Sequence, residues 1–280
     1  PTSGPLADSM TSAIAPASDP AALTPGQRLY LAEYDQVPFR DPTRGYLVLA
    51  PQRTGSNYLC RRLCNVRGRF GMPSEYLNPV AIRMLAPRLL QGAAAETVPF
   101  AEYMTAVQRA RTTTDGWFGL KLQPAQLAAF APGDQALFDF AASFHRIVVL
   151  SRRDKLGQAI SGALAQHTGT WFNDGTPPAV DPSRWPQLFP AIAANLARYI
   201  DEDRRLAALG KALVRPWLRI EYEEILADGQ AAFGRLVEFL SVDDENTTLE
   251  EASDAAVPEK PPGETSEALR AQFLQYIAGS

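Results

Sequence analysis

The sequence predicts an α/β protein with three layers, in which helices cover both faces of a mostly parallel central sheet. Short apolar runs rich in β-branched and aromatic residues alternate with longer amphipathic segments, and polar loops follow the runs. Strands that alternate with helices form βαβ units, and these units build parallel sheets. With 280 residues, 46% of them hydrophobic, the chain can form one sizeable core.

The expected strands span residues 45–50, 116–122, 146–150 and 212–220. The first, GYLVLA, is typical of a buried parallel strand, and Pro216 places the fourth at an edge or a bulge. Helices are expected from residue 56, over 99–111 and 134–142, after the third strand to 166, over 192–209, within 221–240 and over 265–277. Residues 68–79, 181–190 and 241–263 are expected to be loops or irregular segments because they are rich in glycine, proline or acidic residues.

We expect residues 1–40 to form a flexible N-terminal arm and residues 41–280 to form a single domain. The first 25 residues are rich in Pro, Ala, Ser and Thr and lack the charge and apolar pattern of a signal peptide. The chain has no run of about 18 apolar residues, so no membrane span is expected.

Charge and cysteine content narrow the function classes. The chain has 27 basic and 31 acidic residues, which disfavours broad electrostatic binding to nucleic acid or to an anionic membrane. Its two cysteines, Cys60 and Cys64, have neither zinc-site spacing nor the pattern of a disulfide framework, and we predict no metal site. Low cysteine use is compatible with the cytoplasmic location that we expect.

The loop after the first strand has the composition of an anion-binding loop. Backbone N–H groups and the positive end of a helix dipole meet at such a loop, and Gly55 permits close backbone approach. The other polar donors are Gln52, Arg53, Thr54, Ser56 and Asn57. An ordinary turn and helix cap explains the same residues, so both interpretations stay open on this segment alone. A nucleoside-triphosphate loop is disfavoured, because Gly-Lys-Ser/Thr is missing.

A second basic group directly follows the third strand. Arg152 and Arg153 precede an expected helix that carries Ser161. An arginine at a strand end can bind a phosphate through paired donors, and a serine can add a hydroxyl. A solvated, charged helix start explains the run equally simply, and the residues alone favour that interpretation. Two separated anion sites would suit a ligand with phosphate groups at both ends.

These segments resemble those of the sulfotransferases. PQRTGSNYL is similar to their 5′-phosphosulfate loop, PKSGTTWL, with Arg53 at the lysine position and Asn57 at a threonine position. The Gln-Arg-Thr-Gly-Ser variant is similar to the bacterial Stf0 and NodH-type branch, which includes trehalose 2-sulfotransferase. RRDKLGQAIS resembles the arginine and serine that bind the 3′-phosphate of PAPS, 3′-phosphoadenosine 5′-phosphosulfate. Either Arg152 or Arg153 fits, and we prefer Arg152 because it lies nearer the strand.

The resemblance implies a P-loop-like sulfotransferase fold, PAPS as co-substrate without a metal, and roles for three residues. GMPSEYL is similar to a segment whose glutamate is the proposed general base of the branch, which assigns that role to Glu75. A glutamate with a pKa of about 4.3 is ionised at neutral pH; without the resemblance, a surface carboxylate is the simpler interpretation. Lys121 lies in an apolar run, where an amine needs a partner or must extend to solvent, and the resemblance assigns it to the active site. Arg53 is expected to stabilise charge on the bridging oxygen.

Three residues near the end of the helix that carries Ser161 are candidates for acceptor binding: His167, Trp171 and Phe172. The two aromatic rings could stack on a sugar or belong to the core. Segment 219–226, RIEYEEIL, resembles a late family motif that we interpret mainly as fold support, with Tyr222 near the nucleotide as a weaker hypothesis.

The function implied by the resemblance is transfer of a sulfuryl group from PAPS to a hydroxyl of a carbohydrate or glycolipid acceptor, by in-line displacement. Two alternatives stay open: a metal-dependent small-molecule kinase on a P-loop sheet, and a non-catalytic module that binds PAP, the adenosine 3′,5′-bisphosphate product. The sequence identifies no acceptor and leaves open whether the chain forms a homodimer.

Overall fold

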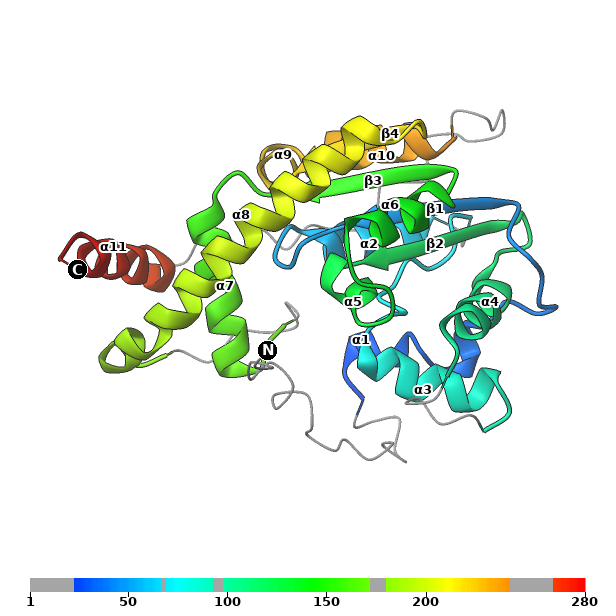
Figure 1. The fold of residues 1–280 in the computed structure, drawn as a ribbon, viewed down its shortest axis with the longest axis horizontal. Helices are drawn as coiled ribbons and strands as arrows, with labels where there is room; N and C mark the ends of the chain where they lie inside the picture. Colours follow the sequence, from blue (N-terminus) through cyan, green and yellow to red (C-terminus); the bar gives the residue numbers. More distant parts are fainter. Residues whose placement is uncertain (1–22, 67–68, 93–97, 172–179, 242–263, 280) are drawn as a thin grey trace.

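A computed structural model describes residues 23–66, 69–92, 98–171, 180–241 and 264–279. Within these residues four strands form one parallel sheet in the order β2-β1-β3-β4 (Figure 1). The strands are β1 (Arg44–Leu49), β2 (Trp117–Leu122), β3 (Arg146–Ser151) and β4 (Trp217–Glu221). The α/β fold with a mostly parallel sheet is therefore confirmed.

Helices connect and cover the strands. Those before β3 are α1 (Pro25–Arg28), η3 (Ala32–Tyr34), α2 (Ser56–Asn65), α3 (Pro79–Leu89), α4 (Phe100–Arg111), α5 (Pro124–Ala128) and α6 (Asp134–Ala142). Those after β3 are α7 (Lys155–Thr168), η5 (Pro182–Leu188), α8 (Phe189–Ala212), α9 (Tyr222–Ala227), α10 (Gly229–Ser241) and α11 (Glu264–Gly279).

Alternating side chains of the strands divide the core between the two faces of the sheet. Leu47 and Leu49 of β1 lie in a buried cluster with residues of α3, α4, α6 and α8. Tyr46 and Val48 lie in a second buried cluster with residues of α2, α9 and α10. Successive side chains of a strand point to opposite faces, so helices cover both faces and the predicted three layers are present.

A third apolar cluster lies beyond the sheet, where α7, α8, η5 and α11 meet. Figure 1 shows α11 beside α7 at one end of the molecule, and the two helices are in contact. Leu269 and Phe273 of α11 are 0% and 1% exposed, and the Phe273 ring lies edge-on to Phe189 of α8 at 5.6 Å between ring centroids. These contacts attach the C-terminal helix to α7, the helix on which Ser161 lies.

The strand order creates a topological switch point between β1 and β3. The chain passes from β1 to β2 on one side and from β3 to β4 on the other, although β1 and β3 are neighbours. In open parallel sheets, ligands bind beyond the carboxyl ends of the strands at such a switch point. The loops after β1 and β3 carry the two groups of anion-binding candidates.

The expected strand over 212–220 is wrong in its first half. Helix α8 continues to Ala212, and β4 begins only at Trp217. Val214 is 99% exposed, so its apolar character did not indicate burial in the sheet. The prediction that Pro216 marks an edge is confirmed, because β4 is the last strand of the sheet and Pro216 directly precedes it. Helices α3 and α5 were not predicted from the sequence.

The expected N-terminal arm is only partly described. Residues 1–22 lie outside the described residues, so the boundary at residue 40 stays a prediction. Of the expected loop over 241–263, residue 241 ends α10 and the rest also lies outside the described residues. The part after residue 22 lies against α3 and α4. Asp35 pairs there with Arg88 and, at 3.3 Å, with Arg111. Among the helices in the described part of the chain, none has the length and apolar character needed to span a membrane.

Replacing Phe273 with alanine tests whether α11 is part of the core. Removal of a buried phenylalanine ring costs about 3–5 kcal/mol. We expect urea unfolding to show a loss of that size for Phe273→Ala. The neighbouring Leu274 is 45% exposed, and Leu274→Ala is expected to cost about 1 kcal/mol or less. Equal effects of the two substitutions would contradict this packing.

Candidate active site

The loop between β1 and α2 is held in a compact turn. Gly55, the N-cap of α2, has φ +78°, a backbone conformation that L side chains rarely adopt. A Cβ atom on Gly55 would lie 3.0 Å from the ring of Tyr222, so the α9 residue packs directly on the loop. Thr54 is fully buried and donates from its hydroxyl to the Pro51 carbonyl at 2.8 Å. Ser56, 7% exposed, begins α2.

Arg53 extends from this loop to the helix after β3. Its φ is +64°, a conformation uncommon outside glycine that is enriched at functional sites. Its Nε donates to Ser161 Oγ and its Nη1 to the Trp171 carbonyl, each at 2.9 Å. Both partners are neutral, and no carboxylate in the described part of the chain forms an ion pair with Arg53. Burial lowers the pKa of Arg53, and the charge of Arg152 lowers it further although Tyr199 acts oppositely.

Arg152 lies over the first turn of α7. Its guanidinium is 4.6 Å from the centroid of the Tyr222 ring, and its Nη2 is 3.5 Å from Oδ2 of Asp154. Its Nε is buried without a hydrogen-bond partner in the described residues. A Cβ atom on Gly157 would come within 2.8 Å of Nη2, so the missing side chain leaves room for the guanidinium. Gly157 is one helical turn before Ser161, which places Arg152 beside the Arg53–Ser161 contact.

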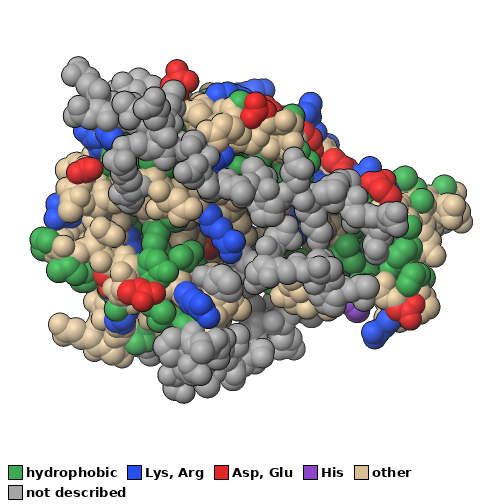
Figure 2. Space-filling view, turned by 180° about the vertical axis from the view of Figure 1, so that it is seen from behind, with side chains coloured by type: hydrophobic (Ala, Val, Ile, Leu, Met, Phe, Trp, Pro, Cys, Tyr) green, Lys and Arg blue, Asp and Glu red, His purple; other side chains and the backbone are tan. Residues whose placement is uncertain are grey.

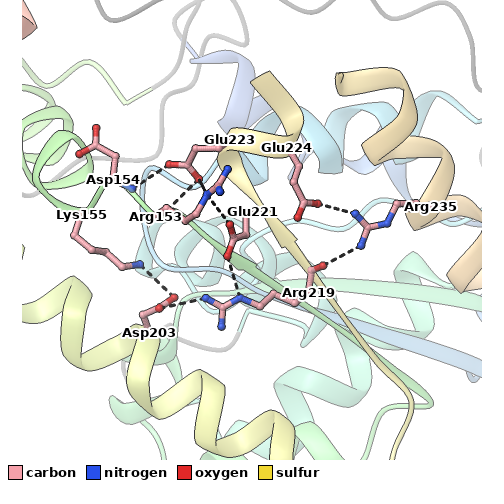
Figure 3. A network of polar contacts seen from close by, with 9 residues as sticks. All are labelled: Arg153, Asp154, Lys155, Asp203, Arg219, Glu221, Glu223, Glu224 and Arg235. Carbon is pink, nitrogen blue, oxygen red and sulfur yellow. Dashed lines mark hydrogen bonds and ion pairs between the residues drawn. The ribbon is translucent and has the colours of Figure 1, made fainter. Parts of the chain in front are cut away.

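Arg153 lies in a different environment. Figure 3 shows its side chain directed to the acidic residues where β4 meets α9. Its Nε lies 2.8 Å from Oε2 of Glu221 and 3.7 Å from Oε2 of Glu223. Its side chain is 65% exposed, against 14% for Arg152. The Glu223 carboxylate also accepts from the backbone N–H groups of Arg153 and Asp154, at 3.0 Å each. These hydrogen bonds lower the pKa of Glu223 although burial opposes them.

Glu75 and Lys121 form an ion pair beside the loop between β1 and α2. Nζ of Lys121 lies 2.6 Å from Oε1 of Glu75, and the two side chains are 6% and 16% exposed. The same ammonium donates to Oδ1 of Asn57, the second residue of α2. The segment before Glu75 is held against β2, because Lys121 N donates to the Ser74 carbonyl at 3.1 Å. A residue of the predicted anion loop and the two predicted catalytic side chains thus share one polar cluster.

Two side-chain amides bind the other oxygen of Glu75. Nε2 of Gln126 donates to Oε2 at 2.7 Å, and Nδ2 of Asn78 lies 3.4 Å from the same atom. Burial by itself raises the pKa of Glu75, but the Lys121 charge and hydrogen bonds from Lys121, Gln126 and Gln123 outweigh it and hold the pKa below its ordinary value. Glu75 is therefore ionised at neutral pH.

Gln52 links the loop to α7 and α8. Its side-chain oxygen accepts from Arg198 at 3.1 Å and from Tyr199 at 3.3 Å, while its backbone carbonyl accepts from Gln158 at 2.7 Å. Arg198 also donates to Asn195 at 3.1 Å. In this structure the Gln52 side chain orients the loop through α8.

The candidates for acceptor binding lie at the far end of α7. His167 is exposed in its last turn, and Trp171 is half-buried, with its carbonyl bound to Arg53. Phe172 lies outside the described residues. The Arg53 contact places the backbone of residue 171 near the loop between β1 and α2, whereas no described contact connects His167 to that loop.

Several residues at this site were not found from the sequence. Gln126, Arg198 and Glu223 each contact a predicted site residue that lies 51, 146 and 70 positions away. A lone glutamine, arginine or glutamate carries no local pattern that identifies it. Figure 2 shows acidic and basic side chains interspersed over one face of the molecule, in keeping with the near-balanced net charge.

The pH dependence of stability tests the Glu75–Lys121 pair. Because the folded-state pKa of Glu75 is lowered, its stabilising contribution is complete above the unfolded pKa of about 4.3 and is lost as pH falls through the folded value. Glu75→Gln should cost about 1–3 kcal/mol at pH 7. We expect that difference from the wild type, measured by urea unfolding, to narrow as pH falls toward about 3. A difference that stays constant over this range would contradict the lowered pKa.

Comparison with known proteins identifies the family. The family model described as Stf0 sulphotransferase matches residues 45–259, about three quarters of the chain. No curated protein matches the sequence. The matched range contains the described strands apart from Arg44, the first residue of β1, together with the loops after β1 and β3 and both Glu75 and Lys121. The chain belongs to the Stf0 sulfotransferase family, as the resemblance of its loops predicted.

Proposed function

We propose that this sulfotransferase moves a sulfuryl group from PAPS to a hydroxyl of a carbohydrate or glycolipid acceptor. The observation that carries the proposal is the meeting of Arg53, Arg152 and Ser161 at the switch point between β1 and β3, with the Glu75–Lys121 pair adjacent to the same loop. Two arginines without full carboxylate neutralisation, one on the loop after β1 and one directly before α7, suit the binding of an anionic ligand.

The donor is bound in two parts. The loop from Gln52 to Asn57 surrounds the 5′-phosphosulfate with backbone N–H groups and the N-terminus of α2.

Arg152 and Ser161 bind the 3′-phosphate. The environments of the two arginines support Arg152 for this role: it is mostly buried with a free Nε, whereas Arg153 is exposed and paired with Glu221. Tyr222, which touches both Gly55 and Arg152, lies between the two parts.

The transfer needs a base and stabilisation of the leaving group. Glu75 takes the acceptor proton while the acceptor oxygen bonds to sulfur, and the bond between sulfur and the bridging oxygen of PAP breaks in line. Arg53 stabilises the charge that develops on that bridging oxygen. When PAPS binds, the Lys121 ammonium leaves Glu75 and binds the sulfuryl oxygens instead. This exchange removes the ammonium that holds the carboxylate pKa low, so Glu75 becomes a stronger base only with donor in place.

The alternatives make different predictions. A small-molecule kinase needs magnesium-dependent ATP turnover, and the loop has no lysine of the type that binds a triphosphate. A non-catalytic module would bind PAP without any transfer.

A screen of PAPS turnover against sugars, glycolipids and small-molecule alcohols identifies the acceptor class. The cytoplasmic location stays a prediction, and a homodimer stays an open possibility.

Separate alanine substitutions of the two arginines test the 3′-phosphate site. PAP should raise the melting temperature, because a ligand that binds only the folded state stabilises it. Loss of a charged hydrogen bond costs about 1.5–3 kcal/mol, or about 10- to 150-fold in affinity. We expect a loss of that size for Arg152→Ala and little change for Arg153→Ala in calorimetric titration with PAP. Unchanged PAP affinity in both variants would contradict the assignment of the 3′-phosphate site to these arginines.

Glu75→Gln tests the base. The amide keeps the size of the side chain but cannot accept the acceptor proton, and a general base contributes about 10²- to 10⁴-fold to rate. We expect kcat/KM to fall within that range while the PAP-induced rise in melting temperature is retained. Turnover at the wild-type rate would exclude Glu75 from the mechanism.

A further inference from the structure

Gln126 lies on an element that also carries Lys121. Strand β2 ends at Leu122, Gln123 is the N-cap of α5, and Gln126 is the third residue of that five-residue helix. Lys121 and Gln126 therefore approach Glu75 from the same strand–helix connection, and each binds a different oxygen of its carboxylate.

The orientation of the Gln126 amide is set by its other hydrogen bond. Backbone N–H of Gln123 donates to Oε1 of Gln126 at 3.2 Å, an interaction typical of a capping box. Only the oxygen of a side-chain amide can accept this hydrogen bond, so the NH₂ group must face the other way. Nε2 accordingly lies 2.7 Å from Oε2 of Glu75 as its donor.

The carboxylate is thereby held at both oxygens. Lys121 binds Oε1 and Gln126 binds Oε2, with Asn78 at a longer 3.4 Å. In the reaction proposed above, Lys121 leaves for the sulfuryl group, and the amides of Gln126, Asn78 and Gln123 then remain, with Gln126 nearer to Glu75 than Asn78. A neutral donor can orient a carboxylate without the full charge compensation that an ammonium supplies.

We propose that Gln126 is a positioning residue that keeps the Glu75 carboxylate aimed at the acceptor hydroxyl once Lys121 has moved, with its own amide fixed by the N-cap of α5. This inference rests on the proposed role of Glu75 and extends it to a residue outside the anion loop and the basic group. Alignment matters to the rate because misplacement of a reacting group by about 1 Å can cost about 10²-fold.

Gln126→Glu is the sharpest test. Glutamate at this position also forms a capping box, so the contact with Gln123 can be kept while the donor to Glu75 becomes a second carboxylate. Two adjacent carboxylates cannot both ionise readily, and the pair then titrates with a raised upper pKa. With PAPS and the best acceptor from the screen, we expect the acid limb of the kcat/KM–pH profile to move up by about one unit or more. Because the substituted side chain cannot donate to Glu75 once it is ionised, the rate on the high-pH plateau should stay below that of the wild type, and PAP affinity should be unchanged.

Gln135→Glu is the matched control. Gln135 is exposed on α6, and its Nε2 donates to Oδ1 of Asp139 at the same 2.7 Å. The control makes the same chemical change beside another carboxylate, away from Glu75, and its pH profile should match the wild type. A Gln126→Glu profile that also superimposes on the wild type would overturn the proposal.

Gln126→Met removes the donor without adding charge, and so covers the case in which the glutamate variant fails to fold. We expect kcat to fall about tenfold or more, with unchanged PAP affinity and KM for PAPS. Wild-type kcat in this variant would refute the positioning role. If Glu75→Gln is inactive but both Gln126 variants behave like the wild type, only this inference fails. If Glu75→Gln keeps full activity, the proposed role of Glu75 fails instead.

Discussion

The hydrogen bond between Arg53 and Ser161 joins the two parts of this site, and the parallel pairing of β1 with β3 makes it possible. These strands are neighbours in the sheet, but their connections leave in opposite directions. The loop after β1 and the helix after β3 therefore lie side by side at this switch point, and Arg53 reaches Ser161 across 108 positions of sequence. Without this strand order the basic residues would be separate surface charges.

Charge is distributed unequally around the switch point between β1 and β3. Glu221 and Glu223, at the end of β4 and the start of α9, pair with Arg153, and Glu223 also binds the turn before α7. Arg152 instead lies on an aromatic ring and shares Asp154, 3.5 Å away, with Arg270, and Arg53 binds only neutral oxygens among the described residues. Burial of a charge without a partner is costly. Anion binding at Arg53 and Arg152 would offset that cost, which supports their proposed roles.

The contacts of Glu75 keep the pKa of its carboxyl group low. Its carboxylate is bound by an ammonium and by amides, and its pKa is lowered although burial acts in the opposite direction. A base of this kind gains strength only when the ammonium is withdrawn. In the proposed mechanism, donor binding is coupled to base strength through Lys121, which lies between Glu75 and Asn57.

Local sequence determined the positions of the first three strands, the loop at Gly55 and the family. These features depend on apolar runs and on short motifs, which act over a few residues. Tertiary structure alone decided where β4 begins, which of Arg152 and Arg153 is mostly buried, and that Gln126 contacts Glu75. Each of these depends on side chains that are distant in sequence, brought together by strand order and packing, and no local pattern encodes such contacts.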